Sequence, residues 1–156
     1  MPIKNTLYFS LICSFFALLL ASYVSYSSIG DYSVLPIYAP PATFLTAYIF
    51  WYFLIEKPKK YTIKRGITIG ICVALFSHYV CWYSIIIAYN ISYYIFDIPL
   101  GSLNEPPIDP ISAIAYMWVY TFYSWLFFGW ISILIGGIIG GVYIYFHHVA
   151  DLRAQK

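Results

Sequence analysis

Four stretches of the chain are almost entirely apolar, at about residues 6–29, 39–55, 66–96 and 111–146. A helix needs about 20 mostly apolar residues to cross the hydrocarbon core of a bilayer, with a range of about 17 to 25. The pattern therefore predicts an all-α integral membrane protein with four transmembrane helices. Pro40 and Pro41 fit the start of the second helix. Residues 1–156 then form a single transmembrane domain.

The last two apolar stretches are longer than one crossing requires. At 1.5 Å per residue, stretches of about 31 and 36 residues reach roughly 46 and 54 Å, against a core of about 30 Å. We place the spans at about 66–90 and 122–146, with an exterior loop or hairpin at about 91–121. Two arrangements fit: the two helices project together under the Pro-rich loop 97–110, or residues 111–121 lie flat in the interface.

The basic residues mark one side of the membrane. All eight Lys and Arg fall in the amino-terminal tail, in segment 56–65 or in the carboxyl-terminal tail, whereas the opposite side carries acidic residues. The positive-inside rule then places both termini in the cytoplasm, in a multi-pass plasma-membrane protein, or an inner-membrane protein if it is bacterial. The apolar run after Lys4 also has the outline of a cleavable signal peptide, but it continues far enough to span.

The composition narrows the function classes. Hydrophobic residues make up 62% of the chain and charged residues 9%, which leaves too little polar surface for a soluble globule. No basic patch suggests nucleic acid, and no nucleotide-binding, protease or transferase motif occurs, so we expect neither an enzyme nor a cofactor. Cys13, Cys72 and Cys81 lie inside apolar runs without a CxxC pair, which argues against a thiol oxidoreductase.

Small residues recur every four positions in the third and fourth apolar stretches. They are Gly66, Gly70 and Ala74 in the third stretch, and Ser132, Gly136 and Gly140 in the fourth. Small side chains let membrane helices approach closely. Because the two faces lie at similar depths from the cytoplasmic boundary, we expect them to meet, with Gly70 near the level of Gly140 or Gly141 and His78 near that of Ser132. The alternative is that the fourth-stretch glycines pack between protomers.

The third span also places His78 and Cys81 three residues apart in the middle of the bilayer. An ionisable residue is costly there and is by default a functional hypothesis. A neutral imidazole needs only hydrogen-bond partners, and Ser77, Ser132 or a nearby Tyr would supply them. A metal or haem site lacks further ligands at that depth. We therefore predict a packing and hydrogen-bonding role for His78, with a gating or proton-linked role as the alternative.

Other polar residues lie near the two membrane surfaces. His147 and His148 are expected at the cytoplasmic edge as interfacial side chains, with pH sensing as the alternative. Asp97, Glu105 and Asp109 belong to the exterior segment. We expect them to be solvated charges, and the alternative is recruitment of a cation or a basic partner.

These observations favour a non-catalytic membrane protein that acts through protein contacts, surrounded by membrane lipid. It would be an accessory subunit or a protective factor, and its topology would suit an immunity protein that blocks a membrane-inserting toxin, by analogy of shape alone. Its partner would be a membrane protein or a second copy. The alternative is a small oligomeric channel or transporter, with a polar path along His78, Ser77, Ser132 and Thr121.

Overall fold

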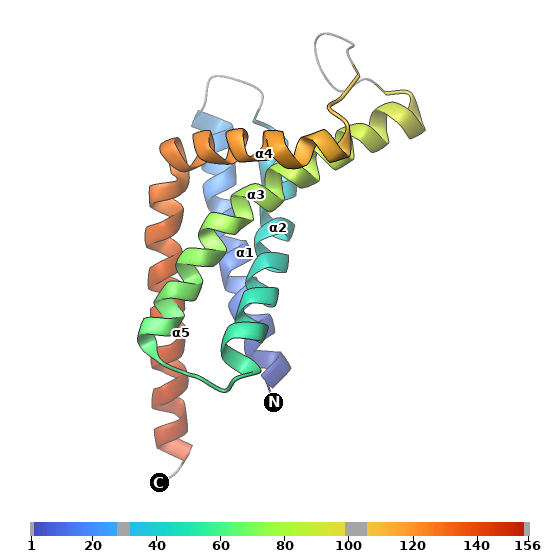
Figure 1. Ribbon diagram of the computed structural model, residues 1–156. Coiled ribbons are helices and arrows are strands. Elements are labelled where there is room, and N and C mark those ends of the chain that lie inside the picture. Colours follow the sequence, from blue (N-terminus) through green and yellow to red (C-terminus); the bar gives the residue numbers. More distant parts are fainter. Residues whose placement is uncertain (1, 28–31, 99–105, 155–156) are drawn as a thin grey trace.

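The computed structural model describes residues 2–27, 32–98 and 106–154, so Glu105 lies outside the described residues. The described elements are five α-helices and two π-helical turns (Figure 1). The helices are α1 (Pro2–Ser27), α2 (Leu35–Trp51), α3 (Ile63–Phe96), α4 (Pro110–Ser124) and α5 (Trp130–Ala154). The turn η1 (Tyr52–Glu56) continues α2, and the turn η2 (Trp125–Gly129) joins α4 to α5. The prediction of an all-α fold is confirmed.

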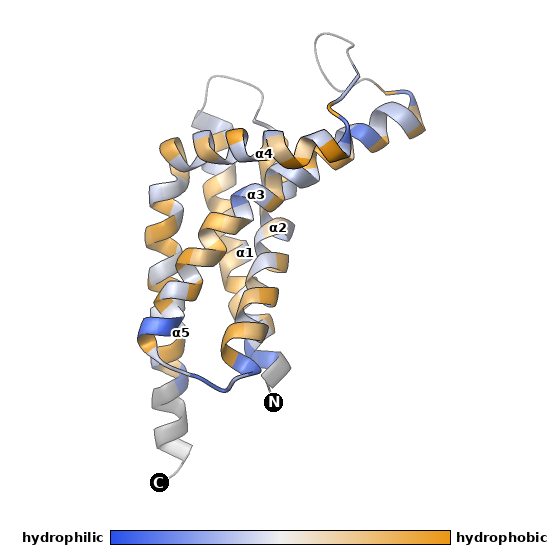
Figure 2. Cartoon of the chain, in the orientation of Figure 1, coloured by the Kyte–Doolittle hydropathy of each residue, from blue (hydrophilic) through white to orange (hydrophobic). Residues whose placement is uncertain are grey.

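Among the described residues, three helical stretches are long and apolar enough to cross a membrane, the third of which combines α4, η2 and most of α5. They cover Lys4–Ser27, Ile63–Phe96 and Pro110–His147. Figure 2 shows hydrophobic residues along most of their length, with hydrophilic residues concentrated near the helix ends and in the connections. These three helices correspond to the first, third and fourth predicted spans.

The second predicted span, at 39–55, differs from expectation. Pro40 and Pro41 were expected at the start of the helix, but α2 begins at Leu35, so both prolines lie inside it. A proline inside a helix has no backbone N–H to donate to the carbonyl four residues before it. The hydroxyl of Ser14 on α1 donates to the carbonyl of Pro40 at 3.0 Å, and this hydrogen bond ties α1 to this part of α2.

The bundle has two chemically different ends (Figure 1). Both termini and the connection between η1 and α3 lie at one end, together with Lys4 and the basic residues of segment 56–65. We call this the basic end. At the other end, the loop end, α3 finishes and α4 begins. The charges are therefore separated along the bundle in the way the sequence predicts.

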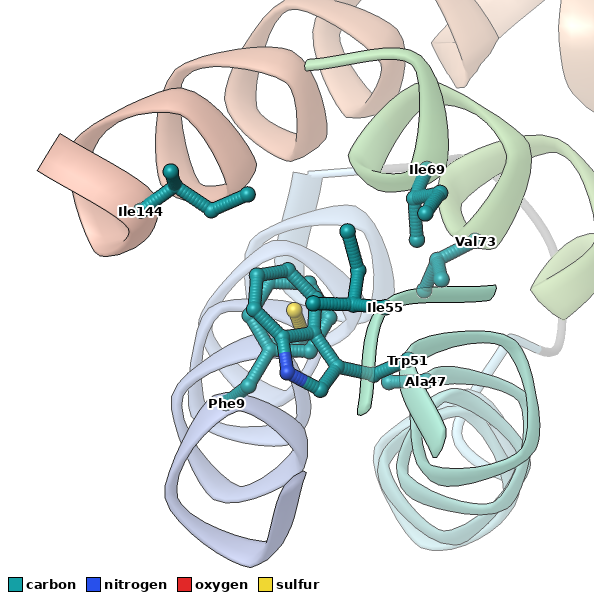
Figure 3. Close-up of a cluster of buried hydrophobic side chains, with 8 residues drawn as sticks. Phe9, Ala47, Trp51, Ile55, Ile69, Val73 and Ile144 are labelled. Carbon is teal, nitrogen blue, oxygen red and sulfur yellow. The ribbon is translucent and has the colours of Figure 1, made fainter. Parts of the chain in front are cut away.

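The largest buried apolar cluster lies toward the basic end (Figure 3). The rings of Phe9 and Trp51 stack with their centroids 3.9 Å apart, and Tyr143 meets the Trp51 ring edge-on at 5.2 Å. Residues from α1, α2, η1, α3 and α5 contribute to the cluster: Phe9, Cys13, Ala47, Trp51, Ile55, Ile69, Val73 and Ile144. This cluster holds the helices together at one end of the molecule.

The fourth apolar stretch, at about 111–146, is divided into two helices of different direction. The chain changes direction at η2, and α4 runs across the bundle while α5 runs along it (Figure 1). A π-helical turn is a recognised cause of such a break. One face of α4 packs on α3 through Ala113, Met117 and Thr121, which are buried and four residues apart. The Tyr79 hydroxyl of α3 also donates to the Ile114 carbonyl at 3.0 Å.

Candidate functional site

The small residues predicted on α3 and α5 face one another within the chain. A Cβ atom built on Gly136 would meet the Gly70 carbonyl and would lie 3.1 Å from the Cβ of Ala74. A Cβ on Gly140 would meet the Gly66 carbonyl in the same way, and would come within 3.3 Å of the Gly70 nitrogen. The two backbones are therefore in direct contact. Gly70 has Gly136 as its closest partner, while its expected neighbour Gly140 lies nearest to Gly66.

Nearer the loop end, His78 joins three elements through hydrogen bonds. Its Nδ1 lies 2.7 Å from the Ser124 hydroxyl, and its Nε2 lies 3.2 Å from the Ser132 hydroxyl. Ser132 also donates to the Phe128 carbonyl at 3.3 Å. The expected neighbour Ser132 is therefore present, whereas Ser77 donates to a carbonyl of its own helix. His78 connects the last residue of α4 to the first turn of α5, across η2.

The π-helical turn explains why both serines face the same imidazole. Ser124 and Ser132 are eight residues apart, whereas two turns of α-helix take about 7.2 residues. A π-bulge takes up about one additional residue. The extra residue returns the two hydroxyls to the same side of the broken helix. The indole of Trp125 donates to the Leu75 carbonyl at 3.2 Å and further fixes the break against α3.

A cavity of about 440 Å³ lies beside this histidine, between α1, α2, α3, α4, η2 and α5. At the basic end α1 and α5 are joined, since the Tyr143 hydroxyl donates to the Asn5 carbonyl at 2.9 Å. Toward the loop end the cavity separates α1 from α5. Its walls are mainly aliphatic and aromatic, with His78, Ser124 and Ser132 as a polar group. This combination of size, apolar lining and few polar groups is typical of small-molecule sites.

Cys81 is buried and lines the same cavity as His78. Its thiol is free, as is that of Cys13, which lines the cavity from α1. Within the described ranges, no three His, Cys, Asp or Glu side chains come together in an arrangement able to hold a metal ion. The polar chemistry available in the cavity is therefore hydrogen bonding through imidazole and hydroxyl groups.

The exterior acids lie at helix ends. Asp97 follows α3 in the left-handed conformation, with φ of 52°. Asp109 precedes α4, and its carboxylate accepts the backbone N–H of Ile111 at 3.1 Å and of Ser112 at 2.9 Å. Hydrogen bonds from Ser112, through its side chain and its backbone, and from Ile111 hold the pKa of Asp109 below its ordinary value. Asp109 therefore serves as an N-cap, which stabilises the start of α4.

A polar network at the basic end was not anticipated from the sequence. Glu56 is only 4% exposed, and one of its carboxylate oxygens accepts the Tyr61 hydroxyl at 2.7 Å. The Tyr61 ring stacks on His147 at 4.8 Å between centroids, and the amide of Asn5 lies 3.0 Å from His147 Nε2. His147 was expected in the interface and Glu56 in the cytoplasmic loop. The available signal was an acidic residue directly after an apolar run and before a group of lysines.

No protein-family model matches the chain, and neither the search of curated proteins nor that of solved structures found a match. Three features of the described residues bear on function: the contact between the α3 and α5 glycines, the cavity beside His78, and the apolar outer surface of the helices.

Proposed function

We propose that the protein is a non-catalytic, multi-pass plasma-membrane protein, or an inner-membrane protein if bacterial, with four spans and cytoplasmic termini. The three long apolar helices support three crossings, and α2 continued by η1 would supply the fourth. The cationic residues at the basic end support a cytoplasmic location for that end. In this arrangement α4, which runs across the bundle, lies in the exterior interface and not in a projecting hairpin (Figure 1).

Labelling of single cysteines tests this orientation. Lys60 and Ile98 are both exposed and lie at opposite ends of the bundle. In a variant with the native cysteines replaced, Lys60→Cys should react with a membrane-impermeant thiol reagent only after the cells are opened. Ile98→Cys should react in intact cells. The reverse pattern would show that the orientation is inverted.

We propose that the protein acts by lateral contact with a partner membrane protein, as an accessory subunit or a protective, immunity-type factor. The observation that carries this proposal is a ridge of five large, exposed apolar side chains at every fourth position on each of α1 and α5, where the other helices carry shorter runs, such as Leu45, Ile49 and Phe53. The ridges are Leu7, Leu11, Phe15, Leu19 and Tyr23 on α1, and Trp130, Leu134, Ile138, Val142 and Phe146 on α5. Ridges with this spacing fit the grooves of another helix.

Photo-crosslinking in native membranes tests the lateral contact. A photoreactive amino acid at Ile138, on the α5 ridge, should form a discrete protein adduct, and so should one at Leu11 on α1. Phe76 on α3 is the control, because it is 46% exposed but no exposed large apolar side chain lies four residues before or after it. Adducts with lipid alone at all three positions would refute the proposed contact.

A polar channel or transporter is the competing function, and the cavity lining argues against it. Its path would need Ser77, His78, Ser132 and Thr121 together. Thr121 is fully buried on the face of α4 that packs on α3, and the cavity walls are mainly apolar. Flux of a polar solute in proteoliposomes, abolished by His78→Leu, would support the transporter and replace the accessory role.

A further inference from the structure

We propose that the cavity beside His78 binds one neutral amphiphile from the membrane: an aliphatic or isoprenoid body with a carbonyl or hydroxyl head that hydrogen-bonds to Ser124. This site is separate from the lateral contact proposed above, because the cavity lies between the helices and the two ridges are exposed.

The size and lining of the cavity fit an apolar occupant. Protein interiors are packed as densely as organic crystals, and this partly open cavity of about 440 Å³ is space that the helices themselves leave unfilled. Water is a poor occupant of apolar space, since a buried water needs two to four polar partners. The walls on the α1 side, formed by residues such as Phe16, Leu20 and Val24, provide none through their side chains. An apolar molecule satisfies these walls by dispersion contacts.

Small side chains create the hollow. Ala17 and Ala21 line it from α1, Ala74 from α3 and Gly136 from α5. On the α3 and α5 side, the small residues let the two backbones touch. On the α1 side, α5 does not close against Ala17 and Ala21, because the cavity lies between these two helices. The space is therefore bounded by helices apolar enough to lie in the membrane, where the proposed occupant dissolves.

The polar group defines the chemistry of the head. Both ring nitrogens of His78 are engaged by hydroxyls, so the groups that can turn to a ligand are those hydroxyls. When Nδ1 carries the proton, it donates to Ser124 and leaves the Ser124 hydrogen for a carbonyl, and Ser132 turns its hydrogen from the Phe128 carbonyl to Nε2. When Nε2 carries the proton, Ser124 donates to Nδ1 and its lone pairs accept from a ligand hydroxyl. Either neutral head is therefore accommodated.

The absence of charge in the lining excludes an ionic head. No Asp, Glu, Lys or Arg side chain is among the described residues around the cavity. Burying an unpaired carboxylate, phosphate or ammonium there would carry a large desolvation cost. A charged lipid would have to leave its head outside the cavity, away from Ser124. Discrimination between neutral and ionic heads is thus a specific consequence of the proposal.

Photolabelling of the full-length protein in proteoliposomes tests the site. The probe is hexadecanol with a diazirine in its chain, and the comparison probes are the matching carboxylate and the matching hydrocarbon. Adducts are located by peptide mass spectrometry. Ala21→Phe places a large side chain in the cavity. Ser22→Phe is the matched control, because Ser22 is the next small residue of the same helix and is exposed outside the cavity.

We expect the hexadecanol probe to label cavity-lining residues in the wild type and in Ser22→Phe, with at least a fivefold loss in Ala21→Phe. Unlabelled hexadecanol should compete on the wild type, which keeps the test valid if Ala21→Phe fails to fold. Ser124→Ala should weaken hexadecanol labelling about three- to tenfold, the range expected for one net hydrogen bond, and leave the hydrocarbon probe unchanged. Labelling confined to outward-facing residues, or equal labelling by the carboxylate, would overturn the proposal.

Discussion

The helix α3 meets α5 in two different ways along its length. In the half toward the basic end, Gly70 and Gly136 bring the two backbones into direct contact. Nearer the loop end, His78 is hydrogen-bonded to Ser124 and Ser132 and faces a cavity of about 440 Å³. The glycine contact forms because glycine has no side chain to keep the two backbones apart. The contact nearer the loop end is made by the His78 side chain, which spans the space between the helices.

This difference shows that small residues do not specify close packing by themselves. In the glycine half, small residues on α3 oppose small residues on α5, so both helices can approach. Ala17 and Ala21 on α1 are also small, but they face a hollow. Small residues allow close contact where the facing helix also carries small residues at the same level. Where the two helices diverge, small residues leave a cavity.

The largest expected effect comes from breaking the glycine contact. A Cβ on Gly136 would collide with the Gly70 carbonyl, whereas a Cβ on Gly137 would lie 3.4 Å from the Ile71 side chain, an ordinary contact. We expect Gly136→Ala to destabilise the protein by about 1–3 kcal/mol, the usual cost of overpacking. Gly137→Ala should be neutral or slightly stabilising, since Ala favours the helix. Thermal unfolding in detergent measures both variants.

The same pair of variants distinguishes packing within the chain from packing between protomers. If the contact lies within the chain, Gly136→Ala should lower the unfolding temperature at any protein concentration. Loss of an oligomer band from Gly136→Ala with an unchanged unfolding temperature would instead place the glycines between protomers, contrary to the structure.

The second largest effect is expected from removing the His78 hydrogen bonds beside the cavity. His78→Leu removes the imidazole partner of the half-buried Ser124 hydroxyl, while Ser132 keeps its bond to the Phe128 carbonyl, and one polar group left unsatisfied costs about 1–3 kcal/mol. His78→Gln retains a donor and an acceptor and should lose less stability. The unfolding temperature in detergent should therefore be highest for the wild type, lower for His78→Gln and lowest for His78→Leu.

A chemical role for His78 would give a different result. Elemental analysis and an absorption spectrum of the purified wild type should reveal neither a stoichiometric metal nor a Soret band. If either signal were present and were lost in His78→Gln, His78 would be a metal or haem ligand and not a packing residue.

The smallest effect is expected at the start of α4, the helix whose other end lines the cavity beside His78. The folded-state pKa of Asp109 is lowered by hydrogen bonds from Ser112 and Ile111. Its stabilising contribution is therefore present above the unfolded pKa of about 3.9 and is lost as the pH falls through the lower folded value. The protection factors for hydrogen exchange at the Ile111 and Ser112 amides should fall below about pH 4, while those of amides at the glycine contact stay unchanged.

Asp109→Asn is the matched variant for this measurement. Asparagine also caps helices but does not titrate. The fall in protection of these two amides at low pH should therefore disappear while the cap is retained. Asp97→Asn, at the end of α3, should leave the exchange at Ile111 unchanged. An identical pH response in Asp109→Asn would show that another group controls the start of α4.

Hydropathy alone determined the helical class and the approximate position of the apolar stretches. It could not give the start of α2, because Pro40 and Pro41 were interpreted as part of the first helical turn, whereas α2 begins at Leu35 and contains both prolines. It also could not locate the break at η2. The segment Trp125–Gly129 is as apolar as its surroundings, and a π-helical turn depends on packing against α3 and not on a local signal.

For the candidate site, the sequence determined which face of each helix carries small residues. A helix repeats every 3.6 residues, so the spacing of four places Gly66 with Gly70 and Gly136 with Gly140. Only the tertiary structure decided that Ser124 completes the His78 bridge, since the extra residue of η2 changes the helical phase. It also decided that Glu56 is buried and that α1 diverges from α5 around a cavity. Periodicity fixes directions on one helix, whereas distances between helices depend on every side chain packed between them.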